Sequence, residues 1–342
     1  MYYIFKYILK RIFYSIFILV GLTILIFLIT HVMPGDPARM ALGGRASDAK
    51  VEELRNKLHL NEPLIDQYLI WMKNFLKGDL GDSLRSSRDV IDDIKELFPA
   101  SLELTIYGAI LLGIVGFSLG ALAGWHNGTW IDDLVRLISY IGVCTPNYVW
   151  AIFFVLVFTY IFPILPSMDR ISTNMSYSNH ITGLITLDAI ITGNFPLFFD
   201  AFKHIVLPAF SLSMGSMAVQ ARVYRSSFVT NLHKEYIWAA RSNSIPKKLI
   251  IFKYLAKPSL AAGITLYGHG IGKIMTGAFL VETIFNWPGL ARYSLDAIYW
   301  KDINAIKAII MFYGLVFIVL NLTVDLLVMY IDPRIRLSKT SR

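Results

Sequence analysis

Residues Ile12–Val32 read IFYSIFILVGLTILIFLITHV, and this run of 21 residues contains no Asp, Glu, Lys or Arg. A helix of this length spans about 30 Å, which is the thickness of the hydrocarbon core of a bilayer. Lys6, Lys10 and Arg11 precede the run, as in a signal peptide. However, the run is longer than a signal-peptide core and no cleavage motif of small residues follows it. The sequence therefore predicts a retained transmembrane helix.

The chain as a whole is too apolar for a water-soluble protein. Of its 342 residues, 55% are hydrophobic and only 16% are charged, against about 25% charged residues in soluble domains. Five more apolar segments follow the first, namely Ser101–Trp125, Leu134–Phe162, Ile205–Val223, Leu260–Phe285 and Ala305–Ile331. This pattern predicts an all-α membrane protein with six transmembrane helices.

Basic residues are distributed unevenly between the loops. If the N-terminus is cytoplasmic, the inner loops and the C-terminal tail contain Arg136, Arg222, Arg225, Lys234, Arg241, Lys247, Lys248, Lys253, Lys257, Arg334, Arg336, Lys339 and Arg342. The outer loop after the fifth segment contains at most Arg292, Lys301 and Lys307. Because Lys and Arg gather on the cytoplasmic side, we expect a multi-pass protein of the cytoplasmic membrane with both termini inside. The net charge of +8 then needs no nucleic-acid partner, and membrane lipid is the expected surrounding.

Four regions are predicted along the chain: residues 1–32 with the first helix, an extracytoplasmic loop at 33–99, a five-helix core at 100–332, and a cytoplasmic tail at 333–342. The first loop is predicted to be structured. Ser47 can cap a helix Asp48–Leu58, a second amphipathic helix covers Ile65–Leu76, and turns follow over Gly78–Ser83. The second outer loop contains the apolar stretch Ile181–Ile191, which is too short to span a bilayer.

The search for chemistry is mostly negative. The sequence contains no Gly-x-x-x-x-Gly-Lys-Ser/Thr phosphate-binding loop, so we expect no ATP hydrolysis by this chain and no cofactor. Seven histidines are scattered without ligand spacing and Cys144 is the single cysteine, so we expect no metal site. The stretch Gly268–Lys273 places Lys273 where a dinucleotide-binding loop has its third glycine. We therefore interpret these glycines as sites of close helix packing.

Several polar residues lie inside predicted spans. Lys273 is mid-span, His269 precedes it by one turn, and Glu282 ends the same segment. Asn321 and Asp325 are one turn apart in the last span. A charge at this depth costs about 3 kcal/mol on insertion scales, so it must face a partner or a watery cavity. Two interpretations remain open: a translocation path, or polar clamps between helices, with Asp325 pairing Arg334 or Arg336.

Between the fourth and fifth spans, residues 233–258 predict a basic helix, a turn and a second helix on the cytoplasmic side. The first helix contains Glu235, Tyr236, Ala239, Ala240 and Arg241. A chain without a nucleotide site must receive energy through a contact, and this segment can dock a separate ATPase. The alternative is a solvated loop that only follows the charge bias.

At this point the chain resembles the membrane permease subunits of ABC importers for dipeptides, oligopeptides and nickel. Seven motifs occur in the family's order and begin at Pro34-Gly35-Asp36-Pro37, Leu60-Asn-Glu-Pro63, Gly78-Asp-Leu-Gly81, Pro99-Ala-Ser-Leu102-Glu-Leu104, His204-Ile-Val-Leu-Pro208, Glu282-Thr-Ile-Phe285 and Asp332-Pro333-Arg334. The resemblance implies the type I importer permease fold. It also implies three partners: a second homologous permease, a cytoplasmic ATPase and an extracytoplasmic solute-binding protein. The 233–258 segment becomes the ATPase-coupling segment.

The chain departs from the family pattern at two positions. Ser244 and Ala291 stand where the family usually has Gly. At Ser244 the turn between the coupling helices favours a positive φ, which Ser adopts only at some cost. Pro246 indicates that the second helix begins there. The second outer loop resembles the dipeptide branch, so peptides are favoured over nickel. A self-contained channel or secondary transporter is the remaining alternative, although no inverted repeat is visible.

Overall fold

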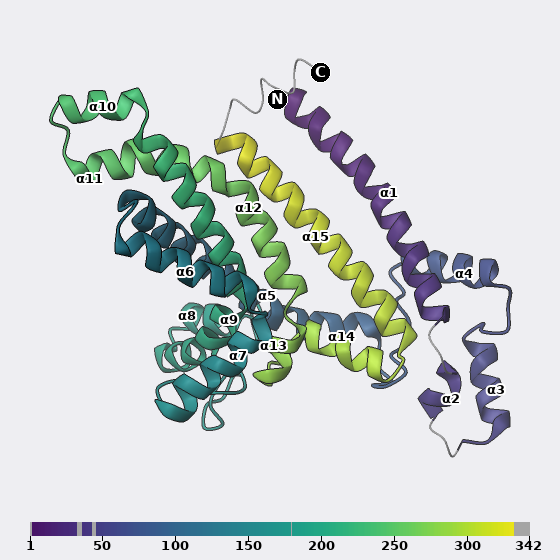
Figure 1. Cartoon of the computed structure of the whole chain (residues 1–342). Helices are drawn as coiled ribbons and strands as arrows, with labels where there is room; N and C mark the ends of the chain where they lie inside the picture. Colours follow the sequence, from purple (N-terminus) through teal and green to yellow (C-terminus); the bar gives the residue numbers. More distant parts are fainter. Residues whose placement is uncertain (1, 33–35, 43–45, 179, 332–342) are drawn as a thin grey trace. The chain divides into compact units, whose positions relative to one another are not determined.

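The computed structural model describes residues 2–32, 36–42, 46–178 and 180–331. Within these ranges the regular elements are helices, apart from one isolated bridge between Asp82 and Asp89 (Figure 1). In order, they are α1 Tyr2–Val32, α2 Pro37–Leu42, α3 Asp48–Lys57, α4 Leu64–Leu76, α5 Val90–Trp125, α6 Trp130–Cys144, α7 Asn147–Val155, the π-helical η1 Leu156–Ile161, α8 Ile185–Ile191, α9 Phe195–Leu232, α10 Glu235–Ser242, α11 Lys247–Leu249, the π-helical η2 Ile250–Leu255, α12 Ala256–Thr276, α13 Phe279–Ile284, α14 Leu290–Tyr299 and α15 Ile303–Ile331.

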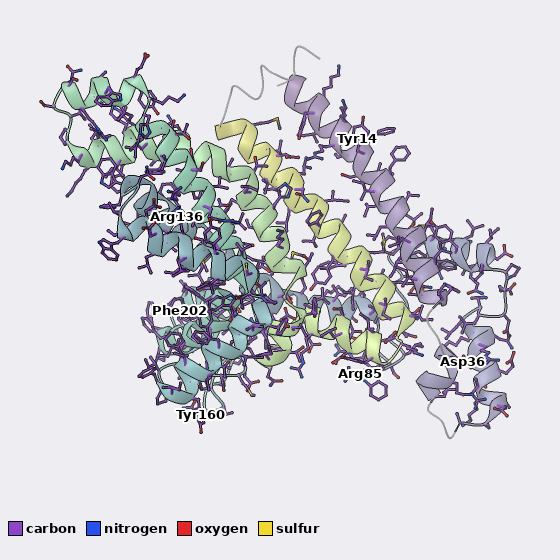
Figure 2. The ribbon with its side chains drawn as sticks, in the orientation of Figure 1. Tyr14, Asp36, Arg85, Arg136, Tyr160 and Phe202 are labelled. Atoms are coloured by element: carbon purple, nitrogen blue, oxygen red, sulfur yellow. The ribbon has the colours of Figure 1, made fainter. Side chains whose placement is uncertain are left out.

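Four helices are long and apolar enough to cross a membrane, and up to six spans result if each of two bent pairs counts as one. The all-α membrane fold is therefore confirmed, while the number of spans lies between four and six. The large side chains of α1 fit a lipid-facing helix: Tyr14, for example, projects away from the helix axis and is 53% exposed (Figure 2).

The predicted third span, Leu134–Phe162, is not one straight helix. Its two halves, α6 and α7–η1, meet at an angle of 109°. Pro146 lies at the break and lacks an N–H group, and it also disfavours helical geometry at Thr145, which is extended at φ −97° and ψ 123°. The predicted fifth span, Leu260–Phe285, likewise ends early, because α12 stops at Thr276 and α13 begins only at Phe279.

The chain divides into two compact units, and residues 1–99 and 289–318 form the first. Its core joins α1, α5, α14 and α15 through Ile26, Ile94, Leu290 and Ile309, among other residues. The predicted loop helices are present as α3 and α4. Ser47 does precede α3, but its side chain makes no capping bond, and its backbone carbonyl accepts from Lys50 N–H instead.

Residues 100–288 and 319–342 form the second unit. Helix α9 is its central element and contacts α6, α7, α8 and α12. The predicted close packing at the α12 glycines is confirmed. A Cβ atom on Gly268 would lie 2.3 Å from Val324 Cγ1, and one on Gly270 would lie 2.6 Å from Leu112 Cδ2. A side chain at Gly268 would clash with Val324, and one at Gly270 would require Leu112 to move, so the glycines favour this close approach.

Candidate functional site

The predicted coupling segment begins with a short helix closed by a well-formed turn. Helix α10 ends at Ser242, and Ser244 adopts φ +54°, so the positive φ expected at this position is present in spite of the missing glycine. Ile245 N–H donates to Ala240 O at 3.1 Å and Ser244 N–H donates to Arg241 O at 3.0 Å. These two bonds define a Schellman motif, which satisfies the carbonyl groups at the end of the helix.

Helix α10 has one buried and one exposed face. Ile237 and Ala240 are 0% and 3% exposed, and they pack against Phe228 of α9 and against Ile250 and Leu255 of η2. Ala240 therefore anchors the helix to its own chain and is not presented to a partner.

The rest of the surface of α10 is exposed. Glu235 and Ala239 of the predicted coupling set lie opposite Ile237 and Ala240, while Tyr236 and Arg241 lie at the two edges of this exposed face. Trp238, which was not among the predicted site residues, is 62% exposed on this face. Tryptophan is enriched at binding hot spots. A tryptophan within the short polar segment 233–258 is therefore a signal in the sequence that could have identified Trp238.

The second helix of the segment begins directly after Pro246, as predicted. Pro246 caps α11 with φ −54° and ψ 137°, and the helix continues without interruption through η2 into α12. Segments Lys247–Leu260 and Gly263–Thr276 are bent by 62° relative to each other. The coupling segment is thus continuous with the helix that carries Lys273.

A cavity of about 220 Å³ lies beside α12 in the second unit. Its walls come from the ends of α6 and α7 and from one face each of α9 and α12. The lining residues are Val143, Asn147, Gly215, Ser216, Val219, Gln220, Leu266, His269, Gly270 and Lys273. Leu266, His269, Gly270 and Lys273 share a face because residues three and four apart are neighbours on a helix. The structure therefore brings together two of the predicted path residues, His269 and Lys273.

The other predicted path residues lie elsewhere. Glu282 is 0% exposed, and its carboxylate accepts a hydrogen bond from Ser101 Oγ at 2.5 Å, so the structure places it in a buried contact between α13 and α5. Of the two interpretations left open by the sequence, this contact is of the second kind, a polar clamp between helices. Asn321 and Asp325 are half-buried on α15 and do not line the cavity. The suggested partners of Asp325, Arg334 and Arg336, lie outside the described residues.

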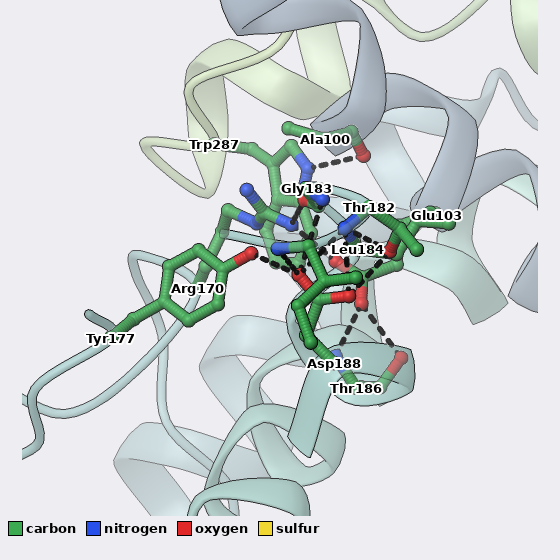
Figure 3. A network of polar contacts seen from close by, with 11 residues as sticks. Ala100, Glu103, Arg170, Tyr177, Thr182, Gly183, Leu184, Thr186, Asp188 and Trp287 are labelled. Atoms are coloured by element: carbon green, nitrogen blue, oxygen red, sulfur yellow. Dashed lines mark hydrogen bonds and ion pairs between the residues drawn. The ribbon is translucent and has the colours of Figure 1, made fainter. Parts of the chain in front are cut away.

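A buried polar network, absent from the sequence prediction, fixes the loop between η1 and α8. Arg170 Nη2 lies 2.6 Å from Glu103 Oε2, with side chains 13% and 3% exposed, and it also donates to Gly183 O at 2.9 Å. The other Glu103 oxygen accepts from Thr186 N and Oγ1, each at 2.7 Å. The Cζ atom of the Arg170 guanidinium lies over the Trp287 ring, 5.7 Å from the ring centroid. Figure 3 shows these groups converging from the loop, α5 and α8.

A second carboxylate closes the same loop. Asp188 accepts from Tyr177 Oη at 2.5 Å and from Thr182 Oγ1 at 2.6 Å, and also from the backbone N–H groups of residues 181–183. Burial alone raises the pKa of Asp188, but the hydrogen bonds from Thr182 and Tyr177 outweigh it and hold the pKa below its ordinary value. Burial and the bond to Asp188 raise the pKa of Tyr177, which stays a donor. Asp188 thus orders the last part of the loop, at Tyr177 and at residues 181–183.

Metal ligands do not gather in the part of the chain that the structure describes, since no group of three His, Cys, Asp or Glu side chains lies close enough to hold an ion. In the cavity, His269 is the one lining residue of these four types. The polar groups of the cavity are hydrogen-bonding side chains, which can both donate and accept, and the ammonium of Lys273.

Comparison with known proteins places this architecture in a family. Residues 116–337 match the family described as binding-protein-dependent transport system inner membrane component, and residues 4–105 match the N-terminal region of the same kind of membrane component. The chain belongs to this family. It is a multi-pass inner-membrane permease subunit of an ABC importer and not an enzyme, and such subunits work with a separate ATPase and a solute-binding protein.

Individual relatives are similar over nearly their whole length. The probable D,D-dipeptide transport system permease protein DdpB of Escherichia coli (strain K12) is 36% identical over 321 residues, covering 94% of this chain and 94% of that protein. The dipeptide transport system permease protein DppB of Alkalihalophilus pseudofirmus is 36% identical over 330 residues, covering 96% and 99%. The glutathione transport system permease protein GsiC of Shigella flexneri is 31% identical over 331 residues, covering 97% and 99%.

Proposed function

We propose that this chain forms one half of the translocation path of an ATP-driven importer of dipeptides or oligopeptides, and that α10 receives the movement of a separate ATPase. The observation that carries the proposal is the two-faced structure of α10. Ile237 and Ala240 fix it to α9 and η2. Trp238 is 62% exposed on the other side of the helix, and Tyr236 is exposed at the edge of the buried face. A helix held in this way transmits a push from its exposed face to the membrane helices.

Small peptides are the substrate class that the relatives favour. The relatives described above are named for dipeptides, D,D-dipeptides and glutathione, all of which contain peptide bonds and a free carboxylate. Nickel is the weaker candidate, because a soft metal prefers several imidazole or thiolate ligands and the cavity contains one imidazole, that of His269.

The proposed arrangement places both termini and α10 in the cytoplasm, in accordance with the excess of Lys and Arg there. A second, homologous permease completes the path, and a solute-binding protein delivers the peptide from outside. The remaining coupling residues, Glu235, Ala239 and Arg241, lie on the face that meets the ATPase. Ser244 and Pro246 shape the turn behind it.

The test replaces Trp238 by Ala in the complex reconstituted in proteoliposomes with its ATPase, partner permease and binding protein. Truncating a hot-spot tryptophan costs at least about 2 kcal/mol of binding, or about 30-fold. We expect ATP-driven dipeptide uptake and peptide-stimulated ATP hydrolysis to fall about tenfold or more, with normal insertion of the variant.

The matched control is Trp130→Ala at the start of α6, because Trp130 is also a strongly exposed tryptophan, at 73%. This variant should retain uptake and hydrolysis. Equal activity of Trp238→Ala and the wild type would show that α10 does not dock the ATPase. Peptide uptake without ATP would favour a self-contained transporter, and ATP-driven uptake of nickel but not of peptide would favour the metal branch.

A further inference from the structure

We propose that the cavity beside α12 is an anion subsite that holds the C-terminal carboxylate of the transported peptide, with the Lys273 ammonium as its counter-ion. This inference rests on the proposed function, because it names the part of the substrate that the path recognises. It assigns the subsite to residues of this chain alone.

The size of the cavity suits a ligand group and not just a single water. Its volume of about 220 Å³ is many times the 10–15 Å³ or so that one water requires. Gly215 lies in its wall on α9, and a Cβ atom there would lie 3.6 Å from Oδ1 of Asn147, another lining residue. A carboxylate together with the adjoining peptide group can be accommodated here.

The polar groups around the cavity favour negative charge. Lys273 supplies an ammonium, Ser216 a hydroxyl and Asn147 an amide, and the lining contains no Asp or Glu. Gln220 is held in place, since its Nε2 donates to Tyr224 Oη at 2.8 Å and to Gly263 O at 3.0 Å. Its oxygen can therefore accept from a peptide N–H, next to the donors that suit a carboxylate.

The charge on Lys273 is not balanced by a neighbouring acid. Among the residues that the structure describes, no Asp or Glu oxygen lies within the 4.0 Å limit of an ion pair with Lys273. An unpaired charge in a span costs about 3 kcal/mol unless it faces a counter-charge or a watery cavity, and Lys273 is exposed on the wall of this cavity. A bound carboxylate would supply the missing charge, whereas the positive amino end of a peptide would be repelled.

The first experiment measures whether the electrostatic potential in the cavity favours negative charge, and it does not depend on transport. In a Cys144→Ser background, Ser216→Cys is allowed to react with a negatively and with a positively charged methanethiosulfonate reagent. We expect the anionic reagent to be favoured, and Lys273→Met to lower the ratio of the two rates about tenfold. Lys203→Met, which removes an exposed lysine outside the cavity, should leave the ratio unchanged. An unchanged ratio in Lys273→Met would overturn the proposal.

The second experiment identifies the ligand group by protection of the same cysteine. A dipeptide should slow the reaction, while the corresponding dipeptide amide and inorganic phosphate at the same concentration should not. Equal protection by phosphate would mean a general anion site, and equal protection by the amide would mean that the carboxylate is not recognised. Either result overturns the proposal. Because no ATPase is needed, these outcomes are distinct from failure of the proposed function, which would be seen as absent ATP-driven uptake.

Discussion

The ion pair between Glu103 and Arg170 should contribute strongly to the stability of the second unit, and a double-mutant cycle can measure it. The variants are Glu103→Gln, Arg170→Met and the two combined. Glu103→Gln keeps the shape of the side chain and its bonds from Thr186, but removes the charge that faces Arg170. Arg170→Met keeps much of the length and the contact with Trp287.

The magnitude follows from the burial of the pair. With side chains only 3% and 13% exposed, water screens the charges weakly. Two unit charges about 4 Å apart attract by about 4 kcal/mol at an effective dielectric constant of about 20. Breaking a buried pair by removing one partner costs about 3–5 kcal/mol, because the other charge stays buried. We expect each single variant to lose about this much free energy of unfolding.

The double variant should be destabilised by much less than the sum of the two single variants. It leaves no uncompensated charge, so the coupling energy should be about 2–3 kcal/mol. The assay is reversible unfolding in mixed detergent micelles. Arg88→Met with Glu96→Gln is the control cycle, since that pair is 53% and 62% exposed and should couple by less than about 1 kcal/mol. Strictly additive effects at Glu103 and Arg170 would refute the reasoning.

Three further changes test other parts of the structure. Ser244→Gly should stabilise the α10 turn by about 1 kcal/mol, because it relieves the positive φ; slower amide hydrogen exchange at Ile245 would show this, and faster exchange would contradict it. Ala240→Asp should lower the stability of the isolated chain by about 2–4 kcal/mol, because Ala240 is buried against its own core; unfolding in micelles measures this loss, and a stable variant would show that this residue does not anchor α10. Asp188 has a lowered pKa in the folded protein. Its stabilising effect is therefore fully present above the unfolded-state pKa of about 3.9 and is lost as the pH falls through the pKa of the folded state. Asp188→Asn should make the free energy of unfolding less sensitive to acid, and identical pH profiles of the variant and the wild type would contradict the assignment.

Much of the local structure could be predicted because it depends on neighbouring residues. Hydrophobic runs long enough to span a bilayer, the amphipathic helices α3 and α4, and the turn at Ser244 all leave patterns within one continuous stretch of about 20 residues or fewer. The break in the third span had a local signal too. Pro146 follows Thr145 in the middle of the run, but average hydropathy does not register a missing N–H group.

The contacts of the polar residues could not be predicted in the same way. Glu103 and Arg170 are separated by 67 positions, and Ser101 and Glu282 by 181. Nothing in the sequence indicates which acid meets which donor at such separations. The sequence therefore leaves both a path role and a clamp role open for Glu282, whereas the fold buries it. Lys273 and His269 were recognised because depth in a span is a local property, but the cavity that they line depends on how α9 meets α12.

Helix α10 and the cavity beside α12 are connected through the same two helices, α9 and α12. Helix α10 is inserted between α9 and the continuous helix α11–η2–α12, and Ile237 and Ala240 are packed against both sides. Most of the cavity lining comes from these same two helices. A force on the exposed face of α10 therefore reaches the cavity walls through covalently continuous helices and not through a chain of loose contacts. The π-helical turn η2 and the 62° bend above it are the places where such a force can change the angle between the coupling segment and Lys273. Docking of the ATPase at Trp238 would then move α12, and the same movement of α12 would release the carboxylate from Lys273.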